Sequence, residues 1–449
     1  MQPVEIEKTL EALRSALDRN ALDEAIALIE HLRAPDQAEV FNELDLDDQT
    51  ALLPRLDPDD SANILEEMSD EDAAEVAEQL DPETLSRIVD EMEPDEAADL
   101  LGDLPKDHAA EVLARLDDPD EVRPLMIHPD ETAGGRMTSE VFALRRRMTV
   151  RDALAALRAW SPDEEAPYYL FVVDRDGILR GVVSLRKLIT ADPGATLESI
   201  MDSDVISVNA SADQEEAAQV MTRYSLFALP VVDATGHLLG MITHDDQVDV
   251  LEEEATEDIY RLGGLPEQER ASGPIRASVR RRLPWLYVNL GTAFLAAGVI
   301  SLFESTIERV AILAAFQSIV AGQGGNSGTQ TLTVMVRSLA LGEIEFRDAR
   351  RAILKQIAVG LLNGIAVGIA VGLLAIALQG KPALGLVIGL AMIGNMAAAG
   401  FAGALVPIVL KRLKIDPALA SGVIVTTVTD TVGFGLFLGL ATIFIQWLD

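Results

Sequence analysis

The sequence contains no cysteine, which excludes disulfide bonds and metal sites built from thiolates. Basic residues are scarce in residues 1–270, where 22 Lys and Arg stand against 65 Asp and Glu, a net charge of −43. So acidic a region argues against nucleic acid as a partner and favours cations. The first 20 residues also lack the long apolar run of a secretory signal peptide, because charged positions interrupt the apolar ones.

Residues 271–449 have a different composition, with 8 acidic and 14 basic residues and long stretches without charge. Five apolar stretches are each long enough to cross about 30 Å of hydrocarbon as a helix. They are Leu283–Phe303, Val310–Val336, Gln356–Gly380, Pro382–Leu410 and Pro417–Leu448. The sequence therefore predicts a multidomain, multi-pass membrane protein, with soluble domains in front of a five-helix transmembrane domain at residues 276–449.

The basic residues around these stretches lie mostly on one side of the predicted membrane. Twelve flank the stretches on the side of the acidic region, and two lie on the other side. The twelve are Arg276, Arg280, Arg281, Arg282, Arg337, Arg347, Arg350, Arg351, Lys355, Lys411, Arg412 and Lys414, and the two are Arg309 and Lys381. By the positive-inside rule, we expect the N-terminus in the cytoplasm and, with five spans, the C-terminus outside.

Asp430 is the only charge in the fifth stretch apart from Asp416 at its edge. A carboxylate in the middle of a membrane helix costs about 2.5–3.5 kcal/mol and usually faces a polar cavity or an ion path. Thr426, Thr427 and Thr431 share its helical face by the i, i+3, i+4 rule. The pattern favours an ion path over the alternative, a buried polar anchor between helices.

The second stretch contains the segment AGQGGNSGTQTLT at residues 321–333. Four glycines and Asn326 within eight residues predict a break or loosening of the helix, which a membrane tolerates only beside protein or a water-filled cavity. Close helix packing through small residues is the alternative. Glycine alone would favour packing, but Asn326, Ser327, Thr329 and Gln330 favour the lining of a pore or gate. We place Gly325 and Asn326 in that lining.

Symmetric pairing of two chains would bring two copies of Asp430 to one axis. Acids with water and carbonyl oxygens suit a hard cation that keeps part of its hydration shell, as Mg²⁺ does, and Ca²⁺ and Mn²⁺ fit the same description. The five stretches contain no basic residue, which argues against an anion path. They also offer no His cluster, no Ser–His pair and no second acid near Asp430, which argues against a membrane enzyme.

Residues 57–116 repeat with a period of twelve, from DPDDSANILEEM to PKDHAAEVLARL. Each unit opens with a capping, proline or acidic residue and then becomes apolar, which predicts a short helix. Stacked short helices that share one apolar stripe form a helical-repeat domain, which we place at residues 1–130. Asp95 and Asp99 lie one turn apart and could bind a metal together, although acids at helix N-termini also have a purely electrostatic explanation.

A second repeat joins FVVDRDGILRGVVSLRKL, residues 171–188, to PVVDATGHLLGMITHDDQ, residues 230–247. Each copy predicts strand, turn, strand and helix, and the pair resembles a tandem CBS domain of α/β type, here at residues 131–252. Many CBS pairs bind adenosine nucleotides through an [ST]-x-x-D motif, which the second copy keeps as Thr243 and Asp246. Lys187 replaces the acid in the first copy, so the sequence argues against ATP binding. Tyr168 and Tyr169 could stack on a base or belong to the strand core.

An acidic segment joins this pair to the membrane region, and we expect a linking helix there, at residues 253–275. A helical-repeat domain, a CBS pair, an acidic linking helix and five spans, in this order, resemble the MgtE family of magnesium channels and transporters. The most specific segments are EEEATEDIYRLGG at 252–264, GQGGNSGTQ at 322–330 and TTVTDTVG at 426–433. The resemblance covers nearly the whole chain.

The resemblance implies a homodimer in a bacterial-type inner membrane, with a pore on the two-fold axis in which Asp430 binds hydrated Mg²⁺. It also implies regulatory Mg²⁺ ions on the soluble region, bound by Asp95, Asp99, Asp213, Glu215, Asp246, Asp249, Glu254, Glu257 and Asp258. The sequence departs from the family pattern at Asn63, Ser225, Leu226 and Gly422. The first three affect regulatory and nucleotide sites, and Gly422 replaces a polar residue near the pore acid.

These observations predict a Mg²⁺ uptake channel or transporter that closes when cytosolic Mg²⁺ bridges acidic domains. A transporter of another divalent cation, such as Co²⁺, Mn²⁺ or Ca²⁺, is the alternative within the same architecture. A membrane-tethered nucleotide sensor is a further alternative, but it leaves Asp430 without a role.

Overall fold

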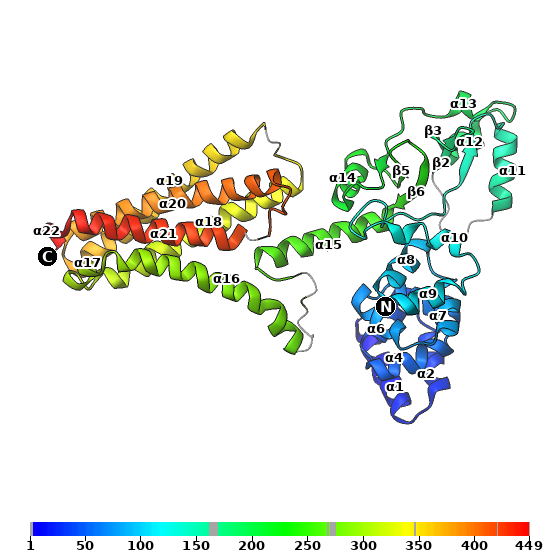
Figure 1. Ribbon diagram of the computed structural model, residues 1–449, viewed down its shortest axis with the longest axis horizontal. Helices are drawn as coiled ribbons and strands as arrows, with labels where there is room; N and C mark the ends of the chain where they lie inside the picture. Colours follow the sequence, from blue (N-terminus) through cyan, green and yellow to red (C-terminus); the bar gives the residue numbers. More distant parts are fainter. Residues whose placement is uncertain are drawn as a thin grey trace. The chain divides into compact units, whose positions relative to one another are not determined.

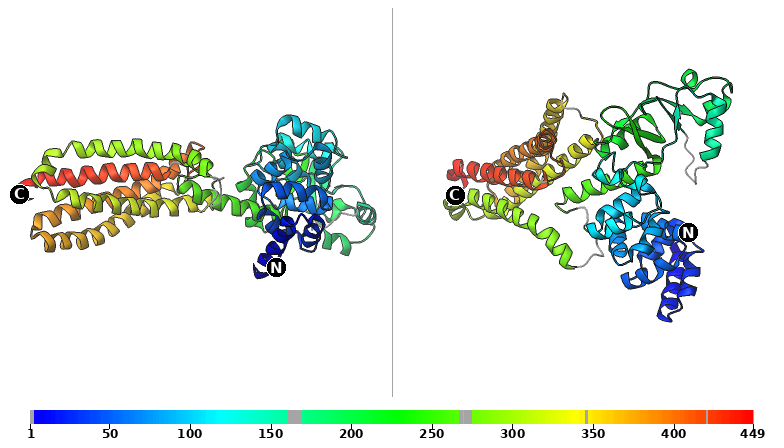
Figure 2. Two further views of the ribbon diagram at one scale, coloured as in Figure 1. Left: turned by 90° about the horizontal axis from the view of Figure 1, so that it is seen from below. Right: turned by 45° about the vertical axis from the view of Figure 1, so that its right-hand side comes forward.

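The computed structural model describes residues 3–160, 169–266, 269, 275–344, 347–419 and 421–448 (Figure 1). The chain divides into two compact units, Met1–Leu251 and Glu252–Asp449, which we call unit 1 and unit 2. Unit 1 contains many short helices and two small sheets. Unit 2 consists of long helices that run along one another, as both views of Figure 2 show.

The twelve-residue repeat of unit 1 forms five successive short helices, as the sequence predicts. They are α5 (Pro58–Glu66), α6 (Asp70–Glu78), α7 (Pro82–Val89), α8 (Pro94–Asp103) and α9 (Lys106–Leu113). The side chains of Asp57, Ser69 and Asp81 accept hydrogen bonds from backbone N–H groups in the first turns of α5, α6 and α7. These caps satisfy donors that would otherwise lack a partner, so each repeat starts its helix at the same position.

Alternate helices of the repeat pack against each other, so that α5 contacts α7, α6 contacts α8, and α7 contacts α9. The same spacing continues toward the N-terminus and gives two stacked rows of helices. The remaining helical elements are α1 (Pro3–Asp18), α2 (Leu22–Ile29), α3 (Ala34–Asn42), α4 (Leu46–Leu52), η1 (Leu53–Arg55), α10 (Pro119–Val122) and η2 (Leu125–Ile127). Their buried side chains form one apolar core, which extends into the second CBS copy through Val208, Met221 and Leu229.

Each CBS copy contains a three-stranded sheet with the same topology. In the first copy β1 (Ala143–Arg145) pairs parallel with β2 (Tyr169–Val173), which pairs antiparallel with β3 (Leu179–Ser184). The second copy repeats this with β4 (Val208–Asn209), β5 (Ala228–Val232) and β6 (Leu238–Thr243). Their helices are α11 (Val150–Trp160), α12 (Leu185–Thr190), α13 (Leu197–Ile200) and α14 (Gln214–Tyr224). Gly177 and Gly236 occupy equivalent turns with positive φ, which explains the glycine in both repeats.

One helix, α15 (His244–Leu262), begins in the second CBS copy and ends in unit 2. Unit 2 continues with α16 (Ile275–Ser301), α17 (Glu304–Arg309), α18 (Leu313–Ala340), α19 (Ala349–Gln379), α20 (Pro382–Arg412), α21 (Ser421–Ile443) and α22 (Ile445–Leu448). Five of these helices are long and match the five predicted spans within several residues at each end. Four of them, α16, α19, α20 and α21, are apolar enough to cross a membrane by length and composition.

Glycines bring α19 and α20 into backbone contact. Gly360, Gly364, Gly368 and Gly372 recur at every fourth position of α19 and face α20. A Cβ on Gly368 would lie 2.9 Å from the carbonyl oxygen of Gly389, and one on Gly372 would lie 2.7 Å from that of Gly385. Larger residues at these positions would force the two helices apart, which is the usual reason for small residues between membrane helices.

The predicted break in the glycine-rich segment of the second span is wrong, because α18 is one continuous helix. Its glycines serve close packing instead, which is the alternative that the sequence left open. Gly324 faces Asn395 of α20, and a Cβ on Gly328 would lie 2.6 Å from Cγ1 of Val425 on α21. Neighbouring helices therefore support the helical conformation that the glycines alone would weaken.

Candidate ion path and metal-binding sites

The side of α18 that no other described helix covers is largely polar, although Ile319 and Val334 are also exposed there. Gly322, Asn326, Thr329, Gln330 and Thr333 are all exposed, and their spacing places them on one face. The opposite face, including Val320, Leu332 and Met335, is buried against neighbouring helices. A polar stripe of this kind at membrane depth needs either water or another protein surface beside it.

The uncovered faces of α16 and α19 are mostly apolar by contrast, with Asn289 and Asn363 as exposed amides. Leu286, Phe294 and Leu295 of α16 are between 59% and 69% exposed, and Leu362 and Leu373 of α19 are 66% and 62% exposed. Such faces suit contact with lipid, because acyl chains cannot hydrogen-bond to them. Among the described residues of unit 2, the uncovered face of α18 is therefore the one with a continuous row of polar side chains, and it is the least suited to lipid.

Asp430 lies half-buried on α21, one turn after the exposed Thr426 on the same face. The hydroxyl of Thr426 donates to the carbonyl oxygen of Gly422, and that of Thr427 donates to Val423 O at 2.6 Å. Gly325 of α18 approaches this turn, since a Cβ built on it would lie 3.9 Å from Cγ2 of Thr426. The structure thus brings Gly325 beside Thr426 and places Asp430 and Asn326 on the neighbouring turns of the two helices.

Asn395 on α20 is a buried polar residue that the sequence analysis did not single out. It is 0% exposed and fits between Gly324 of α18 and Gly433 of α21, both of which leave no room for a Cβ. Its Nδ2 donates to Val320 O at 3.0 Å, and its Oδ1 has no hydrogen-bond partner among the described residues. A lone amide in the fourth span was the available sequence signal, because polar groups inside membrane helices usually serve a function.

In unit 1, acidic residues of α8 lie close to the start of α15. Asp95 is only 4% exposed, and burial and the charge on Asp246 of α15 both raise its pKa. Burial raises the pKa of Glu96 to about 8, with the charge on Asp99 adding to the shift. Burial also raises the pKa of Asp99 to about 7. These carboxylates destabilise one another when ionised, so a bound cation would relieve the repulsion.

Asp246 has a structural role as well as this electrostatic one. Its Oδ2 accepts hydrogen bonds from Thr243 N at 2.8 Å and Thr243 Oγ1 at 2.6 Å, which caps the start of α15. Burial raises the pKa of Asp246, while the two bonds from Thr243 lower it. The threonine and the aspartate of the [ST]-x-x-D motif are thus hydrogen-bonded to each other.

Arg136 is the cation of this acidic cluster, and the sequence analysis missed it. Its charge lowers the pKa values of Glu96, Asp99 and Asp246, and its Nε donates to Gln214 Oε1 at 2.9 Å. Nothing in its local sequence distinguishes it, because the contacts join segments that are distant along the chain. Arg136 offsets part of the negative charge that a metal ion would otherwise meet.

Asp213 and Glu215 lie at the start of α14. Asp213 is exposed and caps that helix, because its Oδ1 accepts a hydrogen bond from Glu215 N at 2.9 Å. Glu215 in turn accepts from Gln219 Nε2 at 3.1 Å. Both side chains therefore have local partners, and their role as metal ligands stays a prediction.

The remaining predicted ligands lie on α15. Asp249 is in unit 1, and Glu254, Glu257 and Asp258 are in unit 2. Glu257 is buried and forms an ion pair with Arg261, whose guanidinium also contacts Asp416 in the connection before α21. Burial raises the pKa of Asp258, the charge on Asp416 raises it further, and that of Arg337 lowers it. The end of α15 is thus held to unit 2 by charged contacts.

Apolar contacts support the same arrangement. Leu262, the last residue of α15, packs against the cluster formed by Leu332, Val336, Ala418 and Val425. Within the described residues, no three acidic or histidine side chains converge closely enough to bind a metal ion. Tyr169 begins β2 opposite Ser184 and is partly buried, whereas Tyr168 lies outside the described residues.

Comparison with known proteins agrees with this architecture. Residues 317–440 match the MgtE family, described as a divalent cation transporter, and residues 32–130 match the MgtE intracellular N domain. Residues 123–194 and 197–249 match CBS domains. Together with the long apolar helices, these matches define the class as a multi-pass membrane transporter of divalent cations, and not an enzyme.

Similar proteins of known function identify the family within this class. The magnesium transporter MgtE of Thermus thermophilus is 40% identical over 330 residues, 73% of each chain. The magnesium transporter MgtE of Enterococcus faecalis is 37% identical over 327 residues, 73% of this chain and 72% of that protein. The chain therefore belongs to the MgtE family of magnesium transporters, and the predicted resemblance and fold class are confirmed.

A solved structure bears on the soluble region. The crystal structure of the cytosolic domain of the Mg²⁺ channel MgtE in complex with ATP is 36% identical, with a TM-score of 0.50. The match covers 54% of this chain and 99% of that one. The argument against ATP binding from Lys187 is therefore not supported, because a related cytosolic domain binds ATP.

Proposed function

We propose that the chain forms a Mg²⁺-selective path for magnesium uptake between α18 and α21. The observation that carries this proposal is the uncovered, largely polar face of α18 near Asp430, in a unit whose other long helices expose mostly apolar side chains. Asp430 supplies the charge for the cation, and Thr426, Gly325 and Asn326 supply hydroxyl, carbonyl and amide oxygens. Oxygen ligands of this kind suit Mg²⁺ that retains part of its water shell.

A second copy of the chain completes this path. One chain leaves the polar face of α18 uncovered, and a two-fold axis beside it would oppose that face to its own copy. Two carboxylates from Asp430 would then share one cation. The N-terminus lies in the cytoplasm and the C-terminus outside, because twelve of the flanking basic residues are on the N-terminal side.

Cytosolic Mg²⁺ closes this path through unit 1 and α15. Asp246 repels Asp95 and Glu96, and Glu96 repels Asp99. This repulsion favours separation of the acidic segments, and Mg²⁺ bound between carboxylates would favour a compact state. A shift from mostly open to mostly closed requires about 5.5 kcal/mol of differential binding, which several shared sites can supply. Asp213, Glu215, Asp249, Glu254, Glu257 and Asp258 are the further ligands that we assign to these sites.

Binding of an adenine nucleotide to the CBS pair is part of the proposal. Support comes from the ATP complex of the related cytosolic domain and from Tyr169, which lies at the beginning of a central strand. Equilibrium dialysis of ATP against the full-length protein and its Tyr169→Ala variant tests this assignment. No binding to the parent protein would remove ATP from the proposal.

Ion flux into vesicles tests the path itself. Asp430→Ala should abolish Mg²⁺ flux while the protein still elutes as the same assembly, whereas Glu308→Gln, an exposed acid of α17, should leave flux unchanged. Undiminished flux in Asp430→Ala would remove Asp430 from the path. Competition by Co²⁺, Mn²⁺ and Ca²⁺ in the same assay decides between a Mg²⁺ path and one for another divalent cation.

A further inference from the structure

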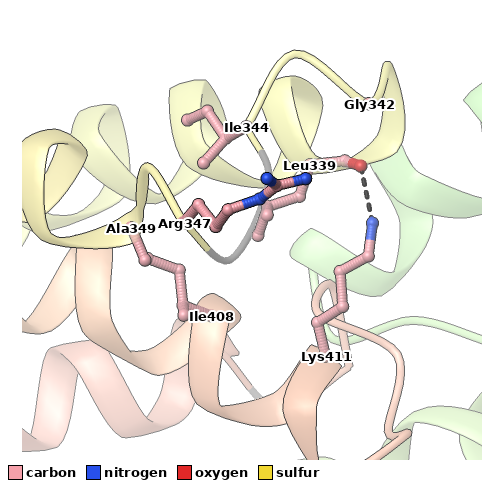
Figure 3. Close-up of a pocket in the computed structure, with 7 residues that line it drawn as sticks. All are labelled: Leu339, Gly342, Ile344, Arg347, Ala349, Ile408 and Lys411. Carbon is pink, nitrogen blue, oxygen red and sulfur yellow. Dashed lines mark hydrogen bonds between the residues drawn. The ribbon is translucent and has the colours of Figure 1, made fainter.

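A cavity of about 420 Å³ lies where α18 ends and α19 begins, beside the last turn of α20 (Figure 3). Its walls are the apolar side chains of Leu339, Ile344, Ala349 and Ile408. Leu339 and Ile408 are buried members of one apolar cluster, against which Ile344 and Ala349 pack. The volume falls within the range of about 300–1,000 Å³ that is usual for ligand sites.

Two cationic side chains border these apolar walls. Figure 3 shows Arg347 and Lys411 approaching the cavity from α19's preceding loop and from α20. Lys411 Nζ donates to Leu339 O at 2.7 Å, which leaves two of its three donors for another acceptor. The nearby acids Glu343 and Asp348 are exposed to solvent.

The cavity also lies at the basic end of the membrane helices. Arg337, Arg350, Arg351, Lys355, Arg412 and Lys414 flank the same helix ends. Anionic lipids concentrate at such a surface, and basic pockets between membrane helices bind their headgroups. A free phosphate would use the cations alone and leave the apolar walls in contact with water, whereas a phospholipid satisfies both parts of the cavity.

We propose that this cavity binds an anionic phospholipid, with the headgroup phosphate between Arg347 and Lys411 and the start of an acyl chain on the apolar walls. The bound lipid contacts the end of α18, the beginning of α19 and the end of α20. Because α18 carries the polar face of the ion path, the lipid helps to fix the position of that helix. This role is additional to ion transport and does not depend on which cation is carried.

Native mass spectrometry of the full-length protein with phosphatidylglycerol or phosphatidylcholine tests the proposal. We expect retention of phosphatidylglycerol and little retention of phosphatidylcholine. The double variant Arg347→Gln/Lys411→Gln should weaken phosphatidylglycerol binding by about fivefold for each cation removed. The matched double variant Arg350→Gln/Arg412→Gln removes the same charge at the same end without touching the cavity, and should weaken it far less.

A third variant separates the contribution of the apolar cavity to lipid binding from that of the two cations. Ala349→Phe fills the cavity and keeps both cations, so it should also reduce lipid retention. Equal losses in the two double variants, or unchanged binding in Ala349→Phe, would overturn the proposal in favour of a diffuse basic surface. Displacement of the lipid by inorganic phosphate, or equal retention of phosphatidylcholine, would overturn it as well.

Discussion

Unit 1 buries carboxylates against one another, whereas the long helices α18 to α21 of unit 2 contain a single acid, Asp430. In unit 1, the charge on Asp246 and burial raise the pKa of Asp95, so the two ionised carboxylates destabilise each other and, under the proposed function, the arrangement responds to ion concentration. In the helices α18 to α21, charge other than Asp430 is confined to the helix ends, and α19 and α20 are held by close backbone contact. The proposed function assigns the sensing of cations to the first arrangement and their conduction to the second.

The difference between the two units can be tested by mutation. The largest loss of stability should come from disrupting the contact between α19 and α20. Gly360→Leu places a side chain against the backbone of Met396, so it should destabilise unit 2 by about 3 kcal/mol or more. Gly298→Leu on α16 is the matched control, because no atom lies within 4 Å of a Cβ there. Thermal unfolding in detergent, followed by size-exclusion chromatography, measures both. Equal stability of the two variants would show that unit 2 does not depend on this contact.

The next largest loss of stability should come from replacing Asn395, which fills the space between Gly324 and Gly433. Asn395→Ala leaves a cavity and removes the hydrogen bond to Val320 O, so we expect a loss of about 2 kcal/mol. Asn395→Leu keeps the volume and should lose only about 1 kcal/mol. The unfolding midpoints of the two variants show whether Asn395 stabilises unit 2 through its volume or through its hydrogen bond. A loss that is equal in both would assign the whole effect to the hydrogen bond.

A smaller effect should follow from removing the cation of the acidic cluster. Arg136→Gln leaves the charges of Glu96, Asp99 and Asp246 without compensation, so Mg²⁺ should protect unit 1 at lower concentration than in the parent protein. Hydrogen exchange of the segment 93–104 across a Mg²⁺ titration measures this. Arg123→Gln, which loses only an exposed pair with Asp120, should leave the titration unchanged. An unchanged midpoint in Arg136→Gln would contradict the role given to this residue.

The last prediction is a dependence of the stability of unit 1 on pH without divalent cations, which is spread over several pH units. Glu96 and Asp99 have folded-state pKa values of about 8 and about 7, above their ordinary values of 4.5 and 3.8. The folded state therefore binds more protons between these limits, and the free energy of unfolding falls as pH rises from about 4 to about 8. The slope is at most about 1.4 kcal/mol per pH unit for each group. Saturating Mg²⁺ should flatten this dependence in hydrogen exchange, and a stability that rises with pH would contradict it.

Local signals in the sequence predicted much of the fold. The helices of the twelve-residue repeat begin at caps and prolines that act within a few residues, and the CBS pair repeats its own turn glycines. The five long helices follow from the length of the apolar stretches, two of which contain polar residues. Each of these features depends on neighbouring residues, so one sequence suffices to find it.

Long-range packing limited the rest of the prediction. The glycines of α18 predict a broken helix when considered alone, but Asn395 and Val425 on other helices fill the space beside them. Arg136 joins an acidic cluster whose members are separated by more than a hundred residues, from Glu96 to Asp246. Among the candidate site residues, the sequence identified Gly325 and Thr426, but only the structure places them beside each other.

The backbone contact between α19 and α20 has a further consequence for measuring motion in this protein. Two helices that touch through glycines at every fourth position should move as one rigid body, because sliding would drive backbone atoms into each other. Any rearrangement during transport then moves the other helices, α18 and α21 among them, relative to this pair. Since the chain has no cysteine of its own, a pair of introduced thiols reports one distance without background. A pair of thiols across α19 and α20 should keep a constant distance. That distance is the reference for changes in the distance between thiols on α18 and α21.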